Sequence, residues 1–234
     1  MSGFSFQETK LTVSRSARMV SSAPLTDPVQ TVWIVLHGYA QLAADFLSEF
    51  EPVARPGVLF VAPEGLSRFY RRPRNTHIGA SWMTAEARDD EITDYLAYLN
   101  KVYDLIVEKQ RRRPKFVGVL GFSQGCSTAS RWVESIHNTR VEPIDSVSRT
   151  IDRMVLWGGT PAVELRSSSY QNDIAPCRVD WVTGTTDRFT PPEKLTELHP
   201  EMDTVNNPIQ MTIFEGKHEI DTNVLNQILY KKLN

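Results

Sequence analysis

The sequence predicts an α/β fold in which helices cover both faces of a mostly parallel central sheet. Short β-rich apolar runs alternate with helical patterns along most of the chain. Residues 58–62 are apolar throughout, which is typical of a buried strand in such a sheet. A length of 234 residues suits one domain over residues 1–234 and can bury a substantial core.

The first half of the chain predicts four β segments and one long helix. Two segments, around residues 7–13 and 17–23, precede a strand at residues 31–36 and the buried strand at 58–62. The helix that follows presents one apolar face, since its apolar residues recur at helical spacing. This face consists of Ile92, Tyr95, Leu96, Leu99, Val102, Tyr103 and Ile106.

The second half predicts further strands at residues 115–120, 152–157, 178–183 and 209–213. Helices follow three of these strands. One of the helices has Pro192 in its first turn, a position that favours proline. The other two helices have apolar faces formed by Cys126, Ala129, Val133 and Ile136, and by Ile220, Val224, Leu225, Ile228 and Leu229. Parallel strands place their carboxyl ends at one edge of the sheet, where this fold class binds ligands.

A G-x-S-x-G motif, Gly121-Phe122-Ser123-Gln124-Gly125, joins one of these strands to the helix after it. The motif alone is weak because glycine and serine are common. Between a strand and a helix it predicts a sharp, strained turn that lifts the serine hydroxyl above the sheet. The glycines are needed because side chains there would collide with the neighbouring strand and helix. The context favours a nucleophile over an ordinary strand-to-helix turn.

A serine nucleophile needs a histidine base, because its hydroxyl reacts poorly at neutral pH. Three histidines follow Ser123 in the chain. His137 would lie about 20 Å away at the far end of the helix, and His199 lies at the end of a polar stretch that suggests the surface. His218 lies just past the strand at residues 209–213, at the ligand-binding edge. We predict His218 as the base; the alternative is a solvated loop histidine.

The base in turn needs an orienting carboxylate, expected between Ser123 and His218 in the sequence. Asp187 closes the segment Gly184-Thr185-Thr186-Asp187 that follows the strand at residues 178–183. Asp180 lies inside that strand, and Asp173 and Asp203 lie in polar loops. Asp187 fits in order and in position, and the alternative is a turn or capping aspartate.

Two backbone N–H groups should stabilise the oxyanion of the reaction. One is that of Gln124, at the start of a helix whose dipole also favours negative charge. The other should come from the loop after the strand at residues 31–36. Tyr39 is the favoured donor there and Ala40 is the alternative. His37 precedes the nucleophile, and we expect it to shape this loop rather than to act as a base.

Taken together, these motifs resemble the phospholipase/carboxylesterase family of α/β-hydrolases, which includes acyl-protein thioesterases and small bacterial carboxylesterases. The likeness extends in order from the strand at residues 31–36 to the final helix. The likeness rests on the following residues: Leu36-His37-Gly38, the motif at residues 121–125, Gly184 with Asp187, and Gly216 with His218.

The resemblance implies an α/β-hydrolase fold and a catalytic triad of Ser123, Asp187 and His218. It implies oxyanion N–H groups from Tyr39 and Gln124, and it matches Trp82 to a tryptophan beside the pocket of the family. It suggests a homodimer. The chain departs from the thioesterases in one loop, where their usual His-Gly-x-Gly-Asp is replaced by His37-Gly38-Tyr39-Ala40-Gln41.

The substrate site is less well determined by the sequence. Phe69, Tyr70, Trp82 and Met83 are candidates to line the pocket, although aromatic residues near strand ends are more often core. The basic segment Arg68–Arg74 could attract a carboxylate or phosphate through Arg68, Arg71, Arg72 and Arg74. We favour the alternative, a solvated loop paired with local acids such as Glu86, Asp89 and Asp90.

We therefore predict a serine carboxylesterase that hydrolyses small to medium esters through an acyl-enzyme. The short loop after the strand at residues 152–157 leaves an open crevice, which suits such substrates. No metal or organic cofactor is implied, since no His/Cys cluster has metal-ligand spacing. Acyl-protein thioesterase, lysophospholipase and serine peptidase are the enzyme alternatives. A catalytically silent receptor or scaffold is disfavoured because all three triad residues are present.

Composition excludes several other classes. Lys plus Arg is 26 and Asp plus Glu is 28, a net charge of −2, which argues against a dominant nucleic-acid role. No apolar stretch is long enough to span a membrane, and the N-terminus lacks the regions of a secretory signal. The two cysteines, Cys126 and Cys177, are too few for a disulfide framework, so a cytoplasmic location is expected. We expect Cys126 to be a small core residue.

Overall fold

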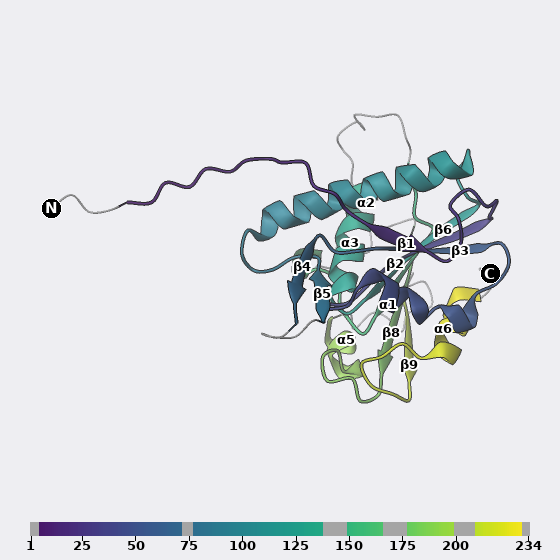
Figure 1. Ribbon diagram of the computed structural model, residues 1–234. Helices are drawn as coiled ribbons and strands as arrows, with labels where there is room; N and C mark the ends of the chain where they lie inside the picture. The colour runs from purple at the N-terminus through teal and green to yellow at the C-terminus, as the bar shows by residue number, and fades with distance from the viewer. Residues whose placement is uncertain (1–4, 72–76, 138–148, 166–176, 199–208, 231–234) are drawn as a thin grey trace.

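The computed structural model describes residues 5–71, 77–137, 149–165, 177–198 and 209–230. Within these residues, one sheet has seven strands in the order β1-β3-β2-β6-β7-β8-β9 (Figure 1). Strand β1 pairs antiparallel with β3, and every other pairing in this sheet is parallel. The prediction of a mostly parallel sheet is confirmed. The strands are β1 Met19–Ser21, β2 Thr31–Leu36, β3 Val58–Pro63, β6 Phe116–Phe122, β7 Arg153–Trp157, β8 Arg178–Gly184 and β9 Ile209–Phe214.

Helices pack on both faces of this sheet, as predicted. Alternate residues of a strand point to opposite faces, so Ile34 belongs to one apolar cluster and Val35 to the other. The first cluster is covered by α2 (Arg88–Gln110), α3 (Gln124–His137) and α5 (Pro192–Leu198), and the second by α1 (Ala43–Ser48) and α6 (Thr222–Tyr230). Figure 1 shows α2 and α1 on opposite sides of the strands. Two short 3-10 turns, η1 (Glu51–Val53) and η2 (Val163–Leu165), complete the described helices.

The N-terminal segment differs from the prediction. Residues 7–13 form no strand, and most of the segment before β1 extends away from the sheet (Figure 1). Phe6, Leu11 and Val13 are 88%, 83% and 77% exposed. The prediction was wrong because β-forming side chains make a strand only beside a partner that accepts their backbone hydrogen bonds. The second predicted segment is strand β1, shortened to three residues.

A two-stranded hairpin that the sequence did not indicate lies beside the central sheet. Strand β4 (Ser67–Tyr70) pairs antiparallel with β5 (Ile78–Ser81). Its second strand touches the loop after β2, where Gln41 forms an isolated bridge with Ala80. A side chain at Gly79 would lie 2.6 Å from the carbonyl oxygen of Ala40. The hairpin thus supports the loop that we predicted to supply an oxyanion donor.

Candidate active site

Ser123 occupies a strained turn between β6 and α3. Its φ is +54°, the left-handed region that non-glycine residues rarely adopt. Its N–H donates to the carbonyl of Trp157 in β7 at 2.9 Å. A Cβ at Gly121 would lie 2.3 Å from the carbonyl oxygen of Gly125, and a Cβ at Gly125 would lie 2.2 Å from that of Leu36. The turn therefore requires glycine at both flanking positions, as a nucleophile elbow does.

Asp187 and His218 are in direct contact. His218 Nδ1 lies 2.8 Å from Asp187 Oδ2. The other oxygen of this buried carboxylate accepts the N–H groups of Phe189 at 2.8 Å and Thr190 at 3.0 Å. Because an ionised carboxylate only accepts hydrogen bonds, Nδ1 carries the proton and Nε2 is left as the basic nitrogen. The arrangement fixes both the orientation and the tautomer of the imidazole.

Two neighbouring strands bring this pair together. Asp187 follows β8 and His218 follows β9, and the two loops are joined by a hydrogen bond from Thr186 N to Gly216 O at 2.9 Å. A Cβ at Gly184 would lie 2.5 Å from the Gly216 carbonyl oxygen, so only glycine allows this approach. The parallel register therefore places Asp187 and His218 at the same edge of the sheet.

The glycine pair after β7 lies between Ser123 and the Asp187–His218 pair. A Cβ at Gly158 would lie 3.0 Å from His218 Nδ1 and 3.2 Å from Asp187 Oδ2. A Cβ at Gly159 would lie 2.6 Å from the carbonyl oxygen of Ser123. The His218 ring also contacts the ring of Phe122, the residue before Ser123, with centroids 4.8 Å apart. The segments after four strands, β6, β7, β8 and β9, thus meet at one place.

The loop after β2 also reaches Ser123. A Cβ at Gly38 would lie 3.1 Å from Ser123 Cβ. The N–H of Ala40 donates to the Ala80 carbonyl at 2.9 Å, which removes this amide as an oxyanion donor. Among the described residues, the N–H groups of Tyr39 and Gln124 have no hydrogen-bond acceptor. The geometry therefore favours Tyr39 over Ala40.

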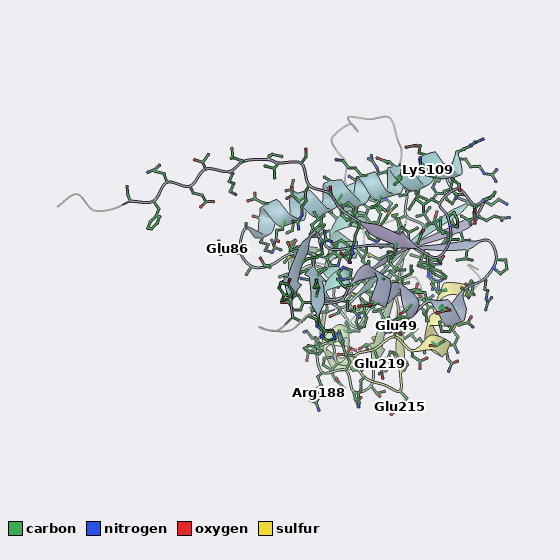
Figure 2. The ribbon with its side chains drawn as sticks, viewed as in Figure 1. Glu49, Glu86, Lys109, Arg188, Glu215 and Glu219 are labelled. Carbon is green, nitrogen blue, oxygen red and sulfur yellow. The ribbon has the colours of Figure 1, made fainter. Side chains whose placement is uncertain are left out.

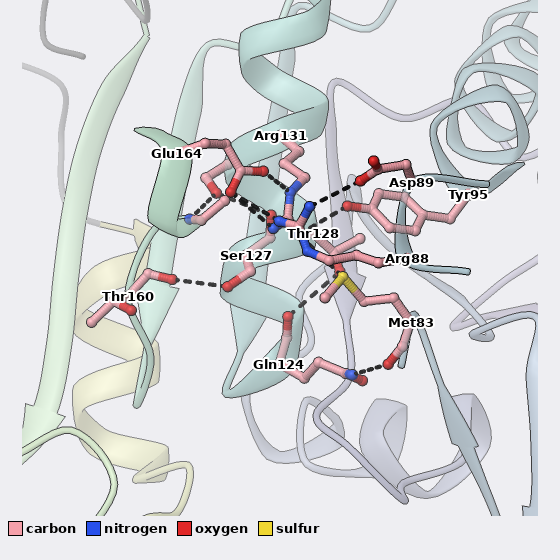
Figure 3. A network of polar contacts seen from close by, with 12 residues as sticks. Met83, Arg88, Asp89, Tyr95, Gln124, Ser127, Thr128, Arg131, Thr160 and Glu164 are labelled. Carbon is pink, nitrogen blue, oxygen red and sulfur yellow. Dashed lines mark hydrogen bonds and ion pairs between the residues drawn. The ribbon is translucent and has the colours of Figure 1, made fainter. Parts of the chain in front are cut away.

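Two glutamine side chains hold this region in place, a role that the sequence did not indicate. Gln41 Oε1 accepts the N–H of Gly38 at 2.7 Å. Gln124 Nε2 donates to the carbonyl of Met83 at 2.8 Å (Figure 3). Its Oε1 accepts the N–H of Trp82 at 3.1 Å. Gln124 therefore ties the segment after β5 to the first turn of α3. No local sequence pattern signals the bonds of Gln124, which join residues more than 40 positions apart.

The predicted pocket residues lie in different environments. The prediction that Trp82 lines the pocket is corrected, because its side chain is 1% exposed and its indole N–H donates to the His37 carbonyl at 2.8 Å. It belongs to the core beneath the site rather than to a pocket wall. Tyr39 is 58% exposed and stacks on Phe69 with centroids 5.2 Å apart. Tyr70 is exposed and Met83 is half-buried.

His37 supports the loop, as expected. It is buried, its Nε2 accepts the N–H of Gly65 at 2.9 Å, and its Nδ1 lies 2.7 Å from the Gly38 carbonyl oxygen. Burial lowers the pKa of this imidazole, so the ring is neutral at ordinary pH. Cys126 is likewise a core residue, and burial raises the pKa of its thiol.

The basic segment has a different partner from the expected ones. Arg68 Nε lies 3.8 Å from Oε1 of the buried Glu64, which is also bound by Arg18 at 2.6 Å. The expected partners Asp89 and Asp90 instead pair with Arg88 and Lys10. Arg72 and Arg74 lie outside the described residues, as do the rejected candidates His199, Asp173 and Asp203.

A polar network anchors the segment after β7 to α3 (Figure 3). Arg131, which is 6% exposed, donates to Glu164 of η2 at 2.5 Å and 3.3 Å and to the Tyr95 hydroxyl at 3.1 Å. Arg88 adds a second cation, 3.0 Å from the same carboxylate. The hydrogen bonds from Arg131 hold the pKa of Glu164 down at about 2. Sequence reasoning missed this network, whose members are far apart in the chain.

The remaining candidates lie away from the site. His137 is the last residue of α3. Asp180 is buried within β8 and pairs with Arg153 at 2.6 Å. In the part of the chain that the structure describes, no group of three or more His, Cys, Asp or Glu residues could hold a metal ion. The helices of that part include none long and apolar enough to cross a membrane.

The chain matches the sequence model of a protein family described as serine hydrolase (FSH1), over residues 33–224. Among solved structures it is similar to a phospholipase/carboxylesterase from Dyadobacter fermentans, with 20% identity over 94% of this chain and 99% of that one and a TM-score of 0.62. The esterase PE8 has 17% identity over 93% and 98%, with a TM-score of 0.63. Zea mays acyl-protein thioesterase 2 has 13% identity over 92% and 98%, with a TM-score of 0.63. None of the curated proteins matches the sequence. The structural likeness confirms the predicted fold.

Proposed function

Because the chain belongs to the FSH1 family of serine hydrolases, we propose that it is a carboxylesterase that hydrolyses small to medium carboxylic esters through an acyl-enzyme. The observation that carries the proposal is the 2.8 Å contact between His218 and Asp187 beside the strained turn of Ser123. In this proposal Ser123 is the nucleophile, His218 the base, and Asp187 the residue that orients the base.

The reaction follows from these positions. As the Ser123 oxygen attacks the ester carbonyl, His218 Nε2 takes its proton and the carbonyl oxygen gains negative charge. The N–H groups of Tyr39 and Gln124 stabilise this oxyanion. The bond to the alcohol then breaks, and His218 returns the proton to the departing oxygen. A water molecule, deprotonated by His218, releases the acid from Ser123 by the same route.

The surroundings of Ser123 support small to medium esters. Tyr39 follows Gly38, the residue beside Ser123, and its stacked, exposed ring offers an apolar surface for an acyl chain together with Phe69. The half-buried Phe69 and the exposed Tyr39 form an open surface rather than a closed tunnel. Similar structures described as esterase and carboxylesterase support an oxygen ester as the substrate, while the thioesterase among them keeps a thioester as the alternative.

The test is burst kinetics with 4-nitrophenyl esters of two to twelve carbons, alongside the matching thioesters. We expect a stoichiometric burst and turnover that favour short and medium oxygen esters. Ser123→Ala should abolish both, whereas Ser127→Ala, the same change one helical turn further along α3, should retain them. Tryptic mapping should find the trapped acyl group on the peptide with Ser123.

Other outcomes would refute Ser123 as the nucleophile or favour another function. Turnover that survives Ser123→Ala would refute this nucleophile. A preference for thioesters or for lysophospholipids would replace the carboxylesterase by one of those enzymes. A folded chain that is inert toward every ester would favour the receptor or scaffold. The cytoplasmic location and the homodimer stay predictions from the sequence.

A further inference from the structure

A second feature of the site is a pocket of about 500 Å³ that opens against His218. Its volume lies within the usual range for small-molecule sites. The residues around it come from the loops after β8 and β9. They are Thr186, Arg188, Phe189, Lys217, His218 and Glu219.

The pocket has two cationic side chains with no carboxylate bound to them. Arg188 and Lys217 are exposed, and in the described part of the chain neither forms an ion pair. The one carboxylate in the lining, Glu219, accepts the backbone N–H of Lys217 at 3.1 Å. Two arginines elsewhere in the molecule, Arg68 and Arg131, differ in that each has a glutamate partner. Two unpaired cations facing one cavity favour an anion there.

The reaction indicates which part of the substrate this pocket receives. His218 must protonate the departing alcohol oxygen, so the alcohol leaves past the imidazole. The carbonyl oxygen of the acyl part instead points to the N–H groups of Tyr39 and Gln124. The Phe189 ring lies 4.7 Å from the His218 ring and is 69% exposed, which offers an apolar face to the alcohol as well. The pocket therefore lies on the alcohol side.

We propose that Arg188 and Lys217 form an anion-binding subsite for the leaving group, so that the enzyme prefers esters whose alcohol part carries a carboxylate or another anionic group. This inference rests on the proposed esterase function. A guanidinium and an ammonium on adjoining loops can share such a group, the first through two parallel N–H donors.

The experiment compares three acetate or adipate esters that release nitrophenols. One is neutral (4-nitrophenyl acetate), one carries its anion on the alcohol (3-carboxy-4-nitrophenyl acetate), and one carries it on the acyl group (4-nitrophenyl hydrogen adipate). Selectivity is kcat/KM for each anionic ester divided by that for the neutral one. We expect Arg188→Gln and Lys217→Gln each to lower alcohol-side selectivity about threefold, and both together about tenfold, the scale of exposed ion pairs.

The matched control is Lys109→Gln, which removes the same charge near the C-terminal end of α2, where Lys109 is paired with Glu108. Figure 2 shows Lys109 and Arg188 at opposite ends of the molecule. This variant should leave all three rates unchanged. Raising the salt from 50 to 500 mM should reduce the selectivity of the native chain, because salt screens exposed charges.

Three results would overturn the inference. These are an unchanged alcohol-side selectivity in the double variant, a loss confined to the adipate ester, and an equal loss in Lys109→Gln. If no ester is hydrolysed, the proposed function fails, and the subsite is then tested by binding of the free alcohol product, 5-hydroxy-2-nitrobenzoate. Calorimetry should find its Kd raised about tenfold in the double variant, and an unchanged Kd would refute the subsite.

Discussion

Asp187→Asn is the most informative single change in the proposed triad. The native carboxylate uses Oδ2 for His218 and Oδ1 for the N–H groups of Phe189 and Thr190. In the variant, the amide oxygen must stay at the Oδ1 position, because an NH₂ there would face two N–H donors. The NH₂ group then points at His218 Nδ1 and forces that nitrogen to accept. The proton moves to Nε2, which can no longer take the proton of Ser123.

The expected cost follows from this wrong tautomer. Holding a catalytic imidazole in the wrong tautomer lowers kcat by about 10⁴-fold, which corresponds to about 5.5 kcal/mol in the activation barrier. Folding should change far less, because the substitution preserves shape and two of the three hydrogen bonds at Asp187. A small loss of thermal stability together with a very large loss of rate is the signature of a residue that acts through His218.

Stopped-flow acylation with 4-nitrophenyl acetate measures the loss directly, and the melting temperature monitors folding. Asp221→Asn is the matched control. Asp221 also accepts a backbone N–H, that of Val224 at 2.8 Å, and asparagine serves equally well at such a helix start. A loss below tenfold in Asp187→Asn, with folding intact, would refute the reasoning, since His218 would then be oriented by something else.

Two further predictions concern stability. Arg131 holds the pKa of Glu164 at about 2, below its ordinary 4.5, so this carboxylate stabilises the folded state above pH 4.5 and that stability is lost as the pH falls toward 2. Glu164→Gln should therefore flatten the pH dependence of the free energy of unfolding over that range, while Glu49→Gln, at an exposed position, should not. Ala40 has a φ of +64°, which costs an L-residue about 1–2 kcal/mol, and glycine loses about 0.5–1 kcal/mol more backbone entropy on folding. Ala40→Gly should therefore stabilise the chain by about 0.5–1 kcal/mol in urea unfolding, whereas Ala44→Gly, in the exposed face of α1, should destabilise it; a loss of stability in Ala40→Gly would contradict the strain.

Much of the fold could be predicted because it depends on local pattern. The apolar run at residues 58–62 became β3, and the helical spacing from Ile92 to Ile106 became the buried face of α2. The candidate acid and base could also be chosen by rule. Parallel strands place their carboxyl ends at one edge of the sheet. Asp187 and His218 each follow a strand, so both could be chosen as candidates before their contact was known.

What the sequence left open depends on partners that no local pattern names. Residues 7–13 have β-forming side chains but find no neighbouring strand, whereas residues 67–70 and 78–81 find each other and form a hairpin. Trp82 is buried in the core, and its indole N–H finds its acceptor in the His37 carbonyl, 45 residues away in the chain. Each outcome is decided by which groups can satisfy one another across space.

The sequence by itself thus determined the order of the parallel strands and of the longer helices, the Ser123 turn with its required glycines, and the family to which the chain belongs. The tertiary structure alone decided which backbone amides near Ser123 remain unbonded, that Trp82 is buried in the core, and that Arg188 joins Lys217 beside His218. The physical reason is range. Periodicity and turn chemistry act between residues a few positions apart, whereas burial, hydrogen bonding and charge act between groups that only the folded chain brings together.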